Sequence, residues 1–371
     1  MRTSRGLRAG AGLLVAPLLV APLLVGPAAA DEPTVGGSKL AARGVVVSPL
    51  APRLPATAAA GWLVADLTTG QVLAAKDPHG RYAPASTLKT LTATTLIPKL
   101  DSHRQVVPTW DDVNVDGSKV GLVEHVAYPI GQLFTAMLVV SGNDAANTLA
   151  GANGGIAKTV EEMNAEATRL HAFDTHAVNA NGLDDPHQLS SAYDLALIAR
   201  AGMQLPAFRD YVQTKHAHIR GPGGRTIAIS SHDKLLYNYA GAIGIKNGYT
   251  VKARATFVGA ATRGGHTLVV TLMRTNPRYW PEAAALLDWG FAATAAGAES
   301  VGELVDPAPL PGEQTQATTA PIRPAAAHLS TGDGGGLPLL PAGIVAAGLA
   351  VIAASLVRGR RGRGKMKLPP I

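Results

Sequence analysis

The sequence predicts an α+β fold, because strand-like and helix-like stretches occupy different parts of the chain. A strand pair is expected across residues 61–76, helices between residue 86 and about residue 200, strands at 242–249, 255–262 and 266–273, and a last helix from about residue 279. The last two strands meet at Arg263-Gly264-Gly265, where glycine permits a tight hairpin. This body of about 240 residues is long enough for one hydrophobic core.

Two Ser-x-x-Lys tetrapeptides occur in the chain, and in this pattern a lysine can activate a serine nucleophile. Ser86-Thr87-Leu88-Lys89 opens a segment with helical periodicity, so a helix would place Lys89 one turn above Ser86. At a helix start the Ser86 N–H lacks an internal partner and can point at an oxyanion. The second tetrapeptide, Ser231-His232-Asp233-Lys234, is expected in a loop or on a strand, so Ser86 and Lys89 are the candidate nucleophile and base.

Lys246-Asn247-Gly248-Tyr249 is predicted on a strand and supplies a second candidate lysine. A lysine becomes a base near neutral pH only if its pKa falls by about three units, and burial and a nearby cation both lower it. Lys246 is the candidate cation, and the glycine beside it leaves room for a substrate backbone. The alternative interpretation of Lys246 is a solvated charge on an edge strand.

Ser141-Gly142-Asn143 is predicted in a loop between two helices, because it follows the apolar run 133–140 and precedes a second helix-like segment. Taken alone, a hydroxyl and an amide two residues apart are typical of a helix cap. The three motifs together, in this order, supply a nucleophile, a base, a proton relay and an anion-holding ammonium. This is the equipment of acyl transfer by a serine.

From about residue 61 to about residue 293 the chain resembles the low-molecular-mass penicillin-binding proteins of the D-alanyl-D-alanine carboxypeptidase type, relatives of the serine β-lactamases. Besides the three motifs, residues 66–73, 84–90, 140–146, 181–184 and 191–196 carry the resemblance. The family implies a β-lactamase/transpeptidase-like fold, in which an antiparallel sheet is flanked by helices and a helical region is inserted between its early and late strands.

The resemblance also implies roles for the motif residues. Ser86 would form the acyl-enzyme, Lys89 would take its proton, and Ser141 would relay a proton to the leaving amine. Asn143 would hold the substrate amide and Lys246 would attract its terminal carboxylate. The net reaction would remove the last D-alanine of a peptidoglycan stem peptide, with β-lactams as inhibitors.

Strand residues 247–249 complete the predicted substrate site. The backbone N–H of Tyr249 would be the second oxyanion donor, and Gly248 belongs to the same strand. The family usually has Lys-Thr-Gly, whereas this chain has Asn247 in place of the threonine that helps bind the carboxylate. An amide NH₂ can donate a similar hydrogen bond from a longer side chain.

Two alternatives share much of this pattern. A class A-like β-lactamase would carry a glutamate in a loop after the second motif, and Asn179-Ala180-Asn181-Gly182-Leu183 has none. A non-catalytic, membrane-tethered wall-binding protein on the same fold is suggested only by Asn247. The chain has no cysteine, and its 11 histidines form no His-Glu-x-x-His, so neither a metal nor another cofactor is predicted.

The N-terminus predicts export. Arg2, Arg5 and Arg8 precede the apolar stretch 13–25, and Ala28-Ala29-Ala30 follows it. This is typical of a secretory signal, with cleavage expected after Ala30.

The C-terminus predicts a membrane anchor. Residues 337–357 lack any charge and would form a helix about 31 Å long, enough to cross the hydrocarbon core. The basic segment 358–371 follows and is expected in the cytoplasm, which leaves the catalytic domain outside.

The expected organisation is a signal peptide (1–30), an N-terminal extension (31–55), a catalytic domain (56–295), a linker rich in Pro, Ala, Thr and Gly (296–336), the membrane helix and the basic tail. The two ends hold nine of the 33 basic residues and no acidic ones, so the part between them has 24 basic against 26 acidic residues. This balance gives no reason to expect a nucleic-acid partner.

Overall fold

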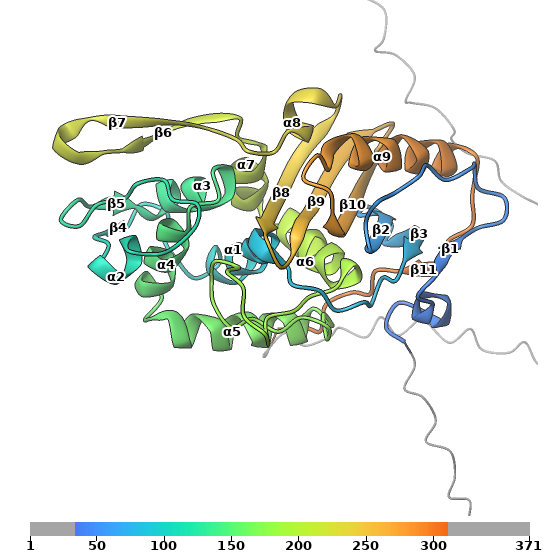
Figure 1. The fold of residues 1–371 in the computed structure, drawn as a ribbon, viewed down its shortest axis with the longest axis horizontal. Helices are drawn as coiled ribbons and strands as arrows, with labels where there is room; N and C mark the ends of the chain where they lie inside the picture. The colour runs from blue at the N-terminus through green and yellow to red at the C-terminus, as the bar shows by residue number, and fades with distance from the viewer. Residues whose placement is uncertain (1–33, 311–371) are drawn as a thin grey trace, which may run out of the picture. The chain divides into compact units, whose positions relative to one another are not determined.

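The computed structural model describes residues 34–310, and a seven-stranded antiparallel sheet is the centre of this part. The strands lie in the order β1 (Val45–Val47), β3 (Gln71–Lys76), β2 (Gly61–Asp66), β10 (His266–Thr275), β9 (Arg254–Arg263) and β8 (Ala242–Thr250). A short strand, β11 (Gly302–Glu303), pairs with β3. Early and late parts of the chain therefore meet where β2 pairs with β10 (Figure 1).

In this part of the chain the α-helices fall between β3 and β8, except for α9, which follows β10. They are α1 (Lys89–Leu96), α2 (Trp110–Val113), α3 (Ile130–Val139), α4 (Asn143–Ala152), α5 (Ile156–Arg169), α6 (Ala192–Gln204), α7 (Pro206–Gln213), α8 (Leu235–Asn238) and α9 (Trp280–Ala295), with 3₁₀ turns η1 (Ser38–Ala41), η2 (Ala85–Leu88) and η3 (Pro222–Gly224). The α+β class, the antiparallel sheet and the inserted helices are as predicted.

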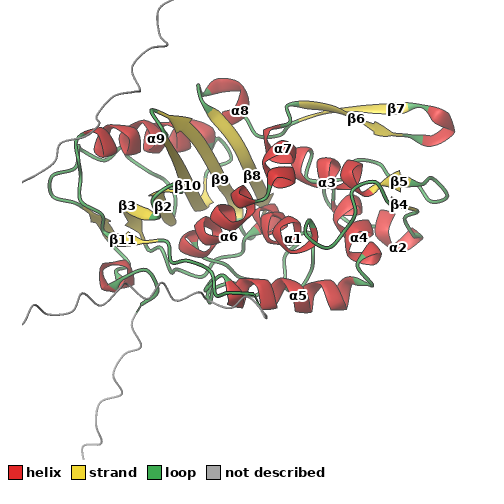
Figure 2. Ribbon diagram, turned by 180° about the vertical axis from the view of Figure 1, so that it is seen from behind, coloured by secondary structure: helices red, strands yellow, loops and turns green. Residues whose placement is uncertain are grey.

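Side-chain alternation along the central strands builds a core on each face of the sheet. On β2, Leu63 and Ala65 join the core shared with the inserted helices, whereas Trp62 and Val64 join the core beneath α9. Helix α6 packs against β2 and β10 on the first side, and α9 packs against β10 on the second (Figure 2). All these residues are almost fully buried, which explains why β2 reads as a continuous apolar run.

Two small antiparallel pairs lie outside the main sheet. The pair β4 (Gln105–Val106) and β5 (Tyr128–Pro129) lies among the inserted helices. The pair β6 (His216–Arg220) and β7 (Thr226–Ser230) forms a long hairpin beside α3 (Figure 1). The histidines of the His216-x-His218 pattern lie on β6, and the ring of His216 contacts the hydroxyl of Ser230.

The folded body extends further than the predicted boundary at residue 295. Val301 and Leu304 are buried, and the pairing of β11 with β3 adds residues 302–303 to the main sheet. The linker predicted from residue 296 therefore begins too early, because the Pro-rich composition that suggested it starts only at about Val305. The N-terminal extension also contributes to the sheet, through β1.

Within residues 34–310 no helix has the length and hydropathy needed to span a membrane. The predicted signal peptide (1–30), membrane helix (337–357) and basic tail (358–371) lie outside the described residues, so these three remain predictions.

Candidate active site

The first Ser-x-x-Lys tetrapeptide lies where a 3₁₀ turn runs into an α-helix. Ser86 is in η2, and Lys89 is the first residue of α1. The helical spacing brings the Lys89 Nζ to 3.0 Å from the Ser86 Oγ. Ser86 is partly exposed, whereas Lys89 is fully buried, so the pair offers a reachable hydroxyl above an enclosed amine.

Lys89 is held by oxygen atoms from two other elements. Its Nζ donates to the Asn143 Oδ1 over 2.6 Å and to the backbone carbonyl of Asn181. Asn143 is in turn fixed by its own amide group, which donates to the Asp116 carbonyl over 2.6 Å. The amine is thus fixed in one position, directly below the serine hydroxyl.

Burial lowers the pKa of Lys89 well below its ordinary value, and the nearby charge of Lys246 lowers this pKa further. The carboxylate of Asp144 acts in the opposite direction. Both causes expected from the sequence, burial and a second cation, are present. Lys89 is therefore suited to be a neutral amine that accepts a proton.

Lys246, Asn247, Gly248 and Tyr249 all lie on β8, beside the nucleophile segment. Lys246 and Gly248 are buried, whereas the side chain of Tyr249, near the end of β8, is 58% exposed. The Lys246 Nζ donates to the Asn247 carbonyl over 2.7 Å, and burial lowers the pKa of Lys246 to about 7, against the opposing charge of Asp233. Lys246 is a buried residue and not a solvated edge charge.

Gly248 brings the backbone of β8 against the start of the nucleophile segment. A Cβ at this position would lie 2.7 Å from the Ser86 backbone nitrogen and 2.6 Å from the Thr256 Oγ1. Thr256, on β9, donates to the Pro84 carbonyl over 2.7 Å and ties the same segment to the sheet. The strand and the 3₁₀ turn are therefore in direct backbone contact at the place where an oxyanion site needs converging N–H groups.

Ser141 lies in the loop between α3 and α4, as predicted. It is 5% exposed and adopts φ of 63°, a left-handed conformation that is unusual for serine. In the described part of the chain no hydrogen bond joins the Ser141 hydroxyl to Ser86 or Lys89, whereas Asn143, two residues later, accepts one from the Lys89 Nζ.

Backbone strain also occurs immediately before the nucleophile. Ala85 has φ of 48°, and Gly182 presses on it so closely that a Cβ on Gly182 would overlap the Ala85 carbonyl. Strained backbone next to reactive groups persists only where the surrounding structure enforces it. Here the Asn181-Gly182 turn provides that constraint on one side, and β8 and β9 provide it on the other.

The sequence identified the motif residues but not the groups that hold them in place. Asn181 supplies a carbonyl to Lys89, and its amide group donates to the Asn147 Oδ1 over 3.1 Å. Asp144 fixes the loop before α3 by accepting backbone N–H groups from Val120, Gly121 and Leu122. The only sequence signal for these roles was their position next to recognised motifs, because a carbonyl contact leaves no side-chain signature.

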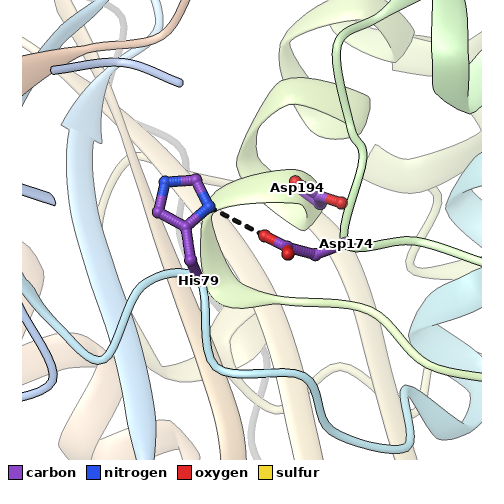
Figure 3. A group of neighbouring side chains, drawn as sticks. All are labelled: His79, Asp174 and Asp194. Carbon is purple, nitrogen blue, oxygen red and sulfur yellow. Dashed lines mark hydrogen bonds and ion pairs between the residues drawn. The ribbon is translucent and has the colours of Figure 1, made fainter. Parts of the chain in front are cut away.

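His79, Asp174 and Asp194 form a second polar cluster (Figure 3). Its three side chains could together offer a metal three ligand atoms. However, the His79 Nδ1 contacts the Asp174 Oδ2 at 2.7 Å, and its Nε2 contacts the Val35 carbonyl at 3.1 Å. Two acceptors suit an imidazolium that donates from both nitrogens, and the neighbouring carboxylates raise the pKa of His79 against the effect of burial. We interpret this cluster as an ion pair that holds the N-terminal segment.

Comparison with known proteins agrees with the geometry. The family described as D-alanyl-D-alanine carboxypeptidase matches residues 48–276. A D-alanyl-D-alanine carboxypeptidase of Mycobacterium tuberculosis is 44% identical over 246 residues, which cover 64% of this chain and 84% of the relative. One of Escherichia coli is 33% identical over 258 residues, which cover 65% of each protein.

Solved structures give the same result. The crystal structure of a D-alanyl-D-alanine carboxypeptidase from Mycobacterium tuberculosis has a TM-score of 0.67 at 43% identity, over 70% of this chain and 99% of that one. The crystal structure of a Streptomyces DD-transpeptidase has a TM-score of 0.62 at 28% identity, over 65% of this chain and 100% of that one. With the serine–lysine pair and its supports, these matches establish that the chain belongs to the D-alanyl-D-alanine carboxypeptidase family of serine peptidases.

Proposed function

We propose that the protein removes the terminal D-alanine from peptidoglycan stem peptides through an acyl-enzyme on Ser86. The observation that carries this proposal is the fully buried Lys89 amine, 3.0 Å from the Ser86 hydroxyl and with a pKa well below its ordinary value. The names of the relatives support the substrate, since both the mycobacterial and the enterobacterial protein are named as D-alanyl-D-alanine carboxypeptidases.

In the acylation step, neutral Lys89 takes the hydroxyl proton while the Ser86 Oγ attacks the carbonyl carbon of the scissile peptide bond. The backbone N–H groups of Ser86 and Tyr249 donate to the oxyanion of the tetrahedral intermediate. The Ser141 hydroxyl donates a proton to the departing nitrogen and regains one from protonated Lys89, the C–N bond breaks, and D-alanine leaves. The product on the enzyme is an ester of Ser86.

The substrate is held by groups on two sides of the nucleophile. Asn143 binds the peptide amide, while the Lys246 ammonium and the Asn247 amide bind the terminal carboxylate. Gly248 lets the peptide backbone lie along β8 without meeting a side chain. In the second step water attacks the ester, the Ser86 oxygen regains a proton through Lys89, and the shortened peptide leaves as a carboxylic acid.

The same nucleophile accounts for penicillin binding, because the strained β-lactam amide is a carbonyl that Ser86 can attack. A β-lactamase would need a group that activates water for rapid release. In this chain the segment after the second motif gives Lys89 the backbone carbonyl of Asn181 and contains no glutamate between residues 179 and 183. We therefore propose slow release of bound penicillin.

The place of action follows from the two ends of the chain and also forms part of this proposal. An exported body, joined by the Pro-rich linker to a membrane helix at residues 337–357, would act on the outer face of the cell membrane. That is where the peptidoglycan substrate lies.

The test is to label the purified protein with a fluorescent penicillin and to measure D-alanine release from a peptide ending in D-Ala-D-Ala. We expect stable labelling and D-alanine release, both lost in Ser86→Ala while the variant keeps its folded circular dichroism spectrum. A folded wild-type protein with neither labelling nor D-alanine release would favour the wall-binding alternative. Rapid penicillin turnover would favour the β-lactamase alternative.

A further inference from the structure

The second Ser-x-x-Lys tetrapeptide places a buried carboxylate close to the active site. Ser231 to Lys234 lie in the turn between β7 and α8. The His232 N–H donates to the Val139 carbonyl at the end of α3 over 3.0 Å, and the Tyr279 hydroxyl donates to the His232 carbonyl over 3.2 Å. These contacts fix the turn between the Ser141 loop and the main sheet.

Asp233 is the buried group of this turn, with 3% of its surface exposed. Its Oδ1 accepts the Leu235 N–H over 2.8 Å, whereas its Oδ2 is buried without a hydrogen-bond partner. A buried, half-satisfied carboxylate is costly, and folded proteins keep such a group only where another charge or a function compensates. The mechanism described above does not use it.

The charge that can compensate it is Lys246, which is buried on β8, the strand against which α8 packs just after Asp233. The charge of Asp233 raises the pKa of Lys246, and burial, which has the larger effect, lowers it. Lys246 has the reciprocal effect on Asp233, whose pKa burial raises to about 6. Among the described residues, three titratable groups interact with the two. The charge of Lys246 lowers the pKa of Lys89 on α1 and of the His232 ring, and the charge of Asp233 raises the pKa of the Tyr279 hydroxyl. Apart from Asp144, which acts on Lys89, these neighbours are cations or groups that are neutral near pH 7.

We propose that Asp233 is a positioning residue for carboxylate recognition, which keeps Lys246 in the ammonium form before the substrate arrives. Lys246 lies in a buried strand environment, and this burial favours its neutral form. A neutral Lys246 cannot attract the terminal carboxylate of the peptide. The negative charge of Asp233 opposes this loss.

The proposal rests on the proposed function and predicts a specific pH dependence. Carboxylate recognition should fall as pH rises through the pKa of Lys246, which is about 7. In Asp233→Asn this alkaline limb of kcat/KM should move to lower pH, because the supporting negative charge is gone. At pH 8 we expect a loss of about tenfold, mainly in KM, which corresponds to a displacement of about one pH unit.

The experiment measures kcat/KM from pH 5 to 9 for two peptides, one ending in D-Ala-D-Ala and the other in its C-terminal amide. For Asp233→Asn we expect kcat/KM to fall only for the peptide with a free terminal carboxylate. The ratio of its kcat/KM to that of the amide should therefore fall about tenfold. Lys234→Gln, which changes an exposed charge in the same turn, should keep the wild-type ratio. Wild-type release of D-alanine in the same assay tests the proposed function separately.

Stability distinguishes this role from a structural one. Since the folded-state pKa of Asp233 lies above its unfolded value, the ionised group destabilises the fold above about pH 4, and Asp233→Asn should match or exceed the wild-type Tm at pH 7.5. If the amide fails to fold, Asp233→Ser replaces it in the same assays. An unchanged pH profile and substrate ratio in a folded variant would overturn the proposal, as would equal losses on both peptides.

Discussion

The two Ser-x-x-Lys tetrapeptides have the same spacing but different environments. In the first, a 3₁₀ turn continues into α1, so that Lys89 lies fully buried 3.0 Å from the Ser86 hydroxyl. In the second, the Ser231 hydroxyl accepts the Asp233 N–H over 3.1 Å, and Lys234 points into solvent. Burial of the lysine, and not its spacing from the serine, therefore makes the lysine a base.

The largest effect is expected when the lysine of each tetrapeptide is replaced by methionine in a separate variant. Lys89→Met removes the buried base, and we expect penicillin acylation to slow by about 10³-fold. The matched change Lys234→Met should leave the acylation rate within about twofold. Stopped-flow labelling with a fluorescent penicillin gives both rates.

The melting temperature shows whether each lysine variant is still folded. Lys89→Met removes a buried amine whose charged form opposes folding, but it also leaves the Asn143 Oδ1 and the Asn181 carbonyl without their donor. We therefore expect a folded variant whose Tm is similar to or below that of the wild type. Comparable losses of acylation in the two variants would show that exposure of a lysine does not decide its role.

Gly248 tests the backbone contact that the first tetrapeptide makes with β8. The Cβ of Gly248→Ala would lie 2.7 Å from the Ser86 nitrogen and 3.0 Å from the Thr87 nitrogen, so the nucleophile segment must shift. We expect acylation to slow by about 10²-fold, the usual cost of a damaged oxyanion site. Gly44→Ala, where a Cβ meets no atom within 4 Å, is the control. Equal acylation rates in Gly248→Ala and the wild type would contradict the assigned contact.

Asn247 tests how the site beside the first tetrapeptide binds the substrate carboxylate. Its Oδ1 lies 3.5 Å from the Lys246 Nζ, at the limit of a hydrogen bond. Asn247→Thr restores the residue usual in the family, and we expect turnover of a D-Ala-D-Ala peptide to stay the same or rise by a few fold. A fall of more than about tenfold, or roughly 1.4 kcal/mol, would count against a role of Asn247 in carboxylate binding.

The smallest effect concerns the serine of the second tetrapeptide. Ser231→Ala removes the acceptor of the Asp233 N–H, so we expect the free energy of unfolding to fall by about 1 kcal/mol, with acylation within about threefold of wild type. Ser86→Ala should do the reverse, abolishing acylation at nearly unchanged stability. Urea unfolding and penicillin labelling of both variants would reveal whether the two roles separate in this way.

Local patterns predicted the central strands and the helices, since these depend on periodicity and turn residues, and the family resemblance implied their arrangement as one antiparallel sheet with inserted helices. The supports of the site could not be predicted in this way. The Asn181 carbonyl on Lys89 and the contact of Gly248 with Ser86 join segments about 90 and 160 residues apart, and only the folded chain brings them together. The end of the body was wrong for the same reason, because two residues of β11 are too short to give a strand pattern.

That short strand has a consequence for the behaviour of shortened forms of the protein. Strand β3 pairs with β2 on one side, while β1 and β11 cover its other edge at residues 74–76 and 71–72. Ending the chain at residue 295 would remove β11 and leave free backbone donors and acceptors at Gln71 and Val72. An uncovered edge strand can pair with another molecule. Residues 302–303 thus cover an edge of β3 that could otherwise pair with a second molecule, independently of any part in the chemistry.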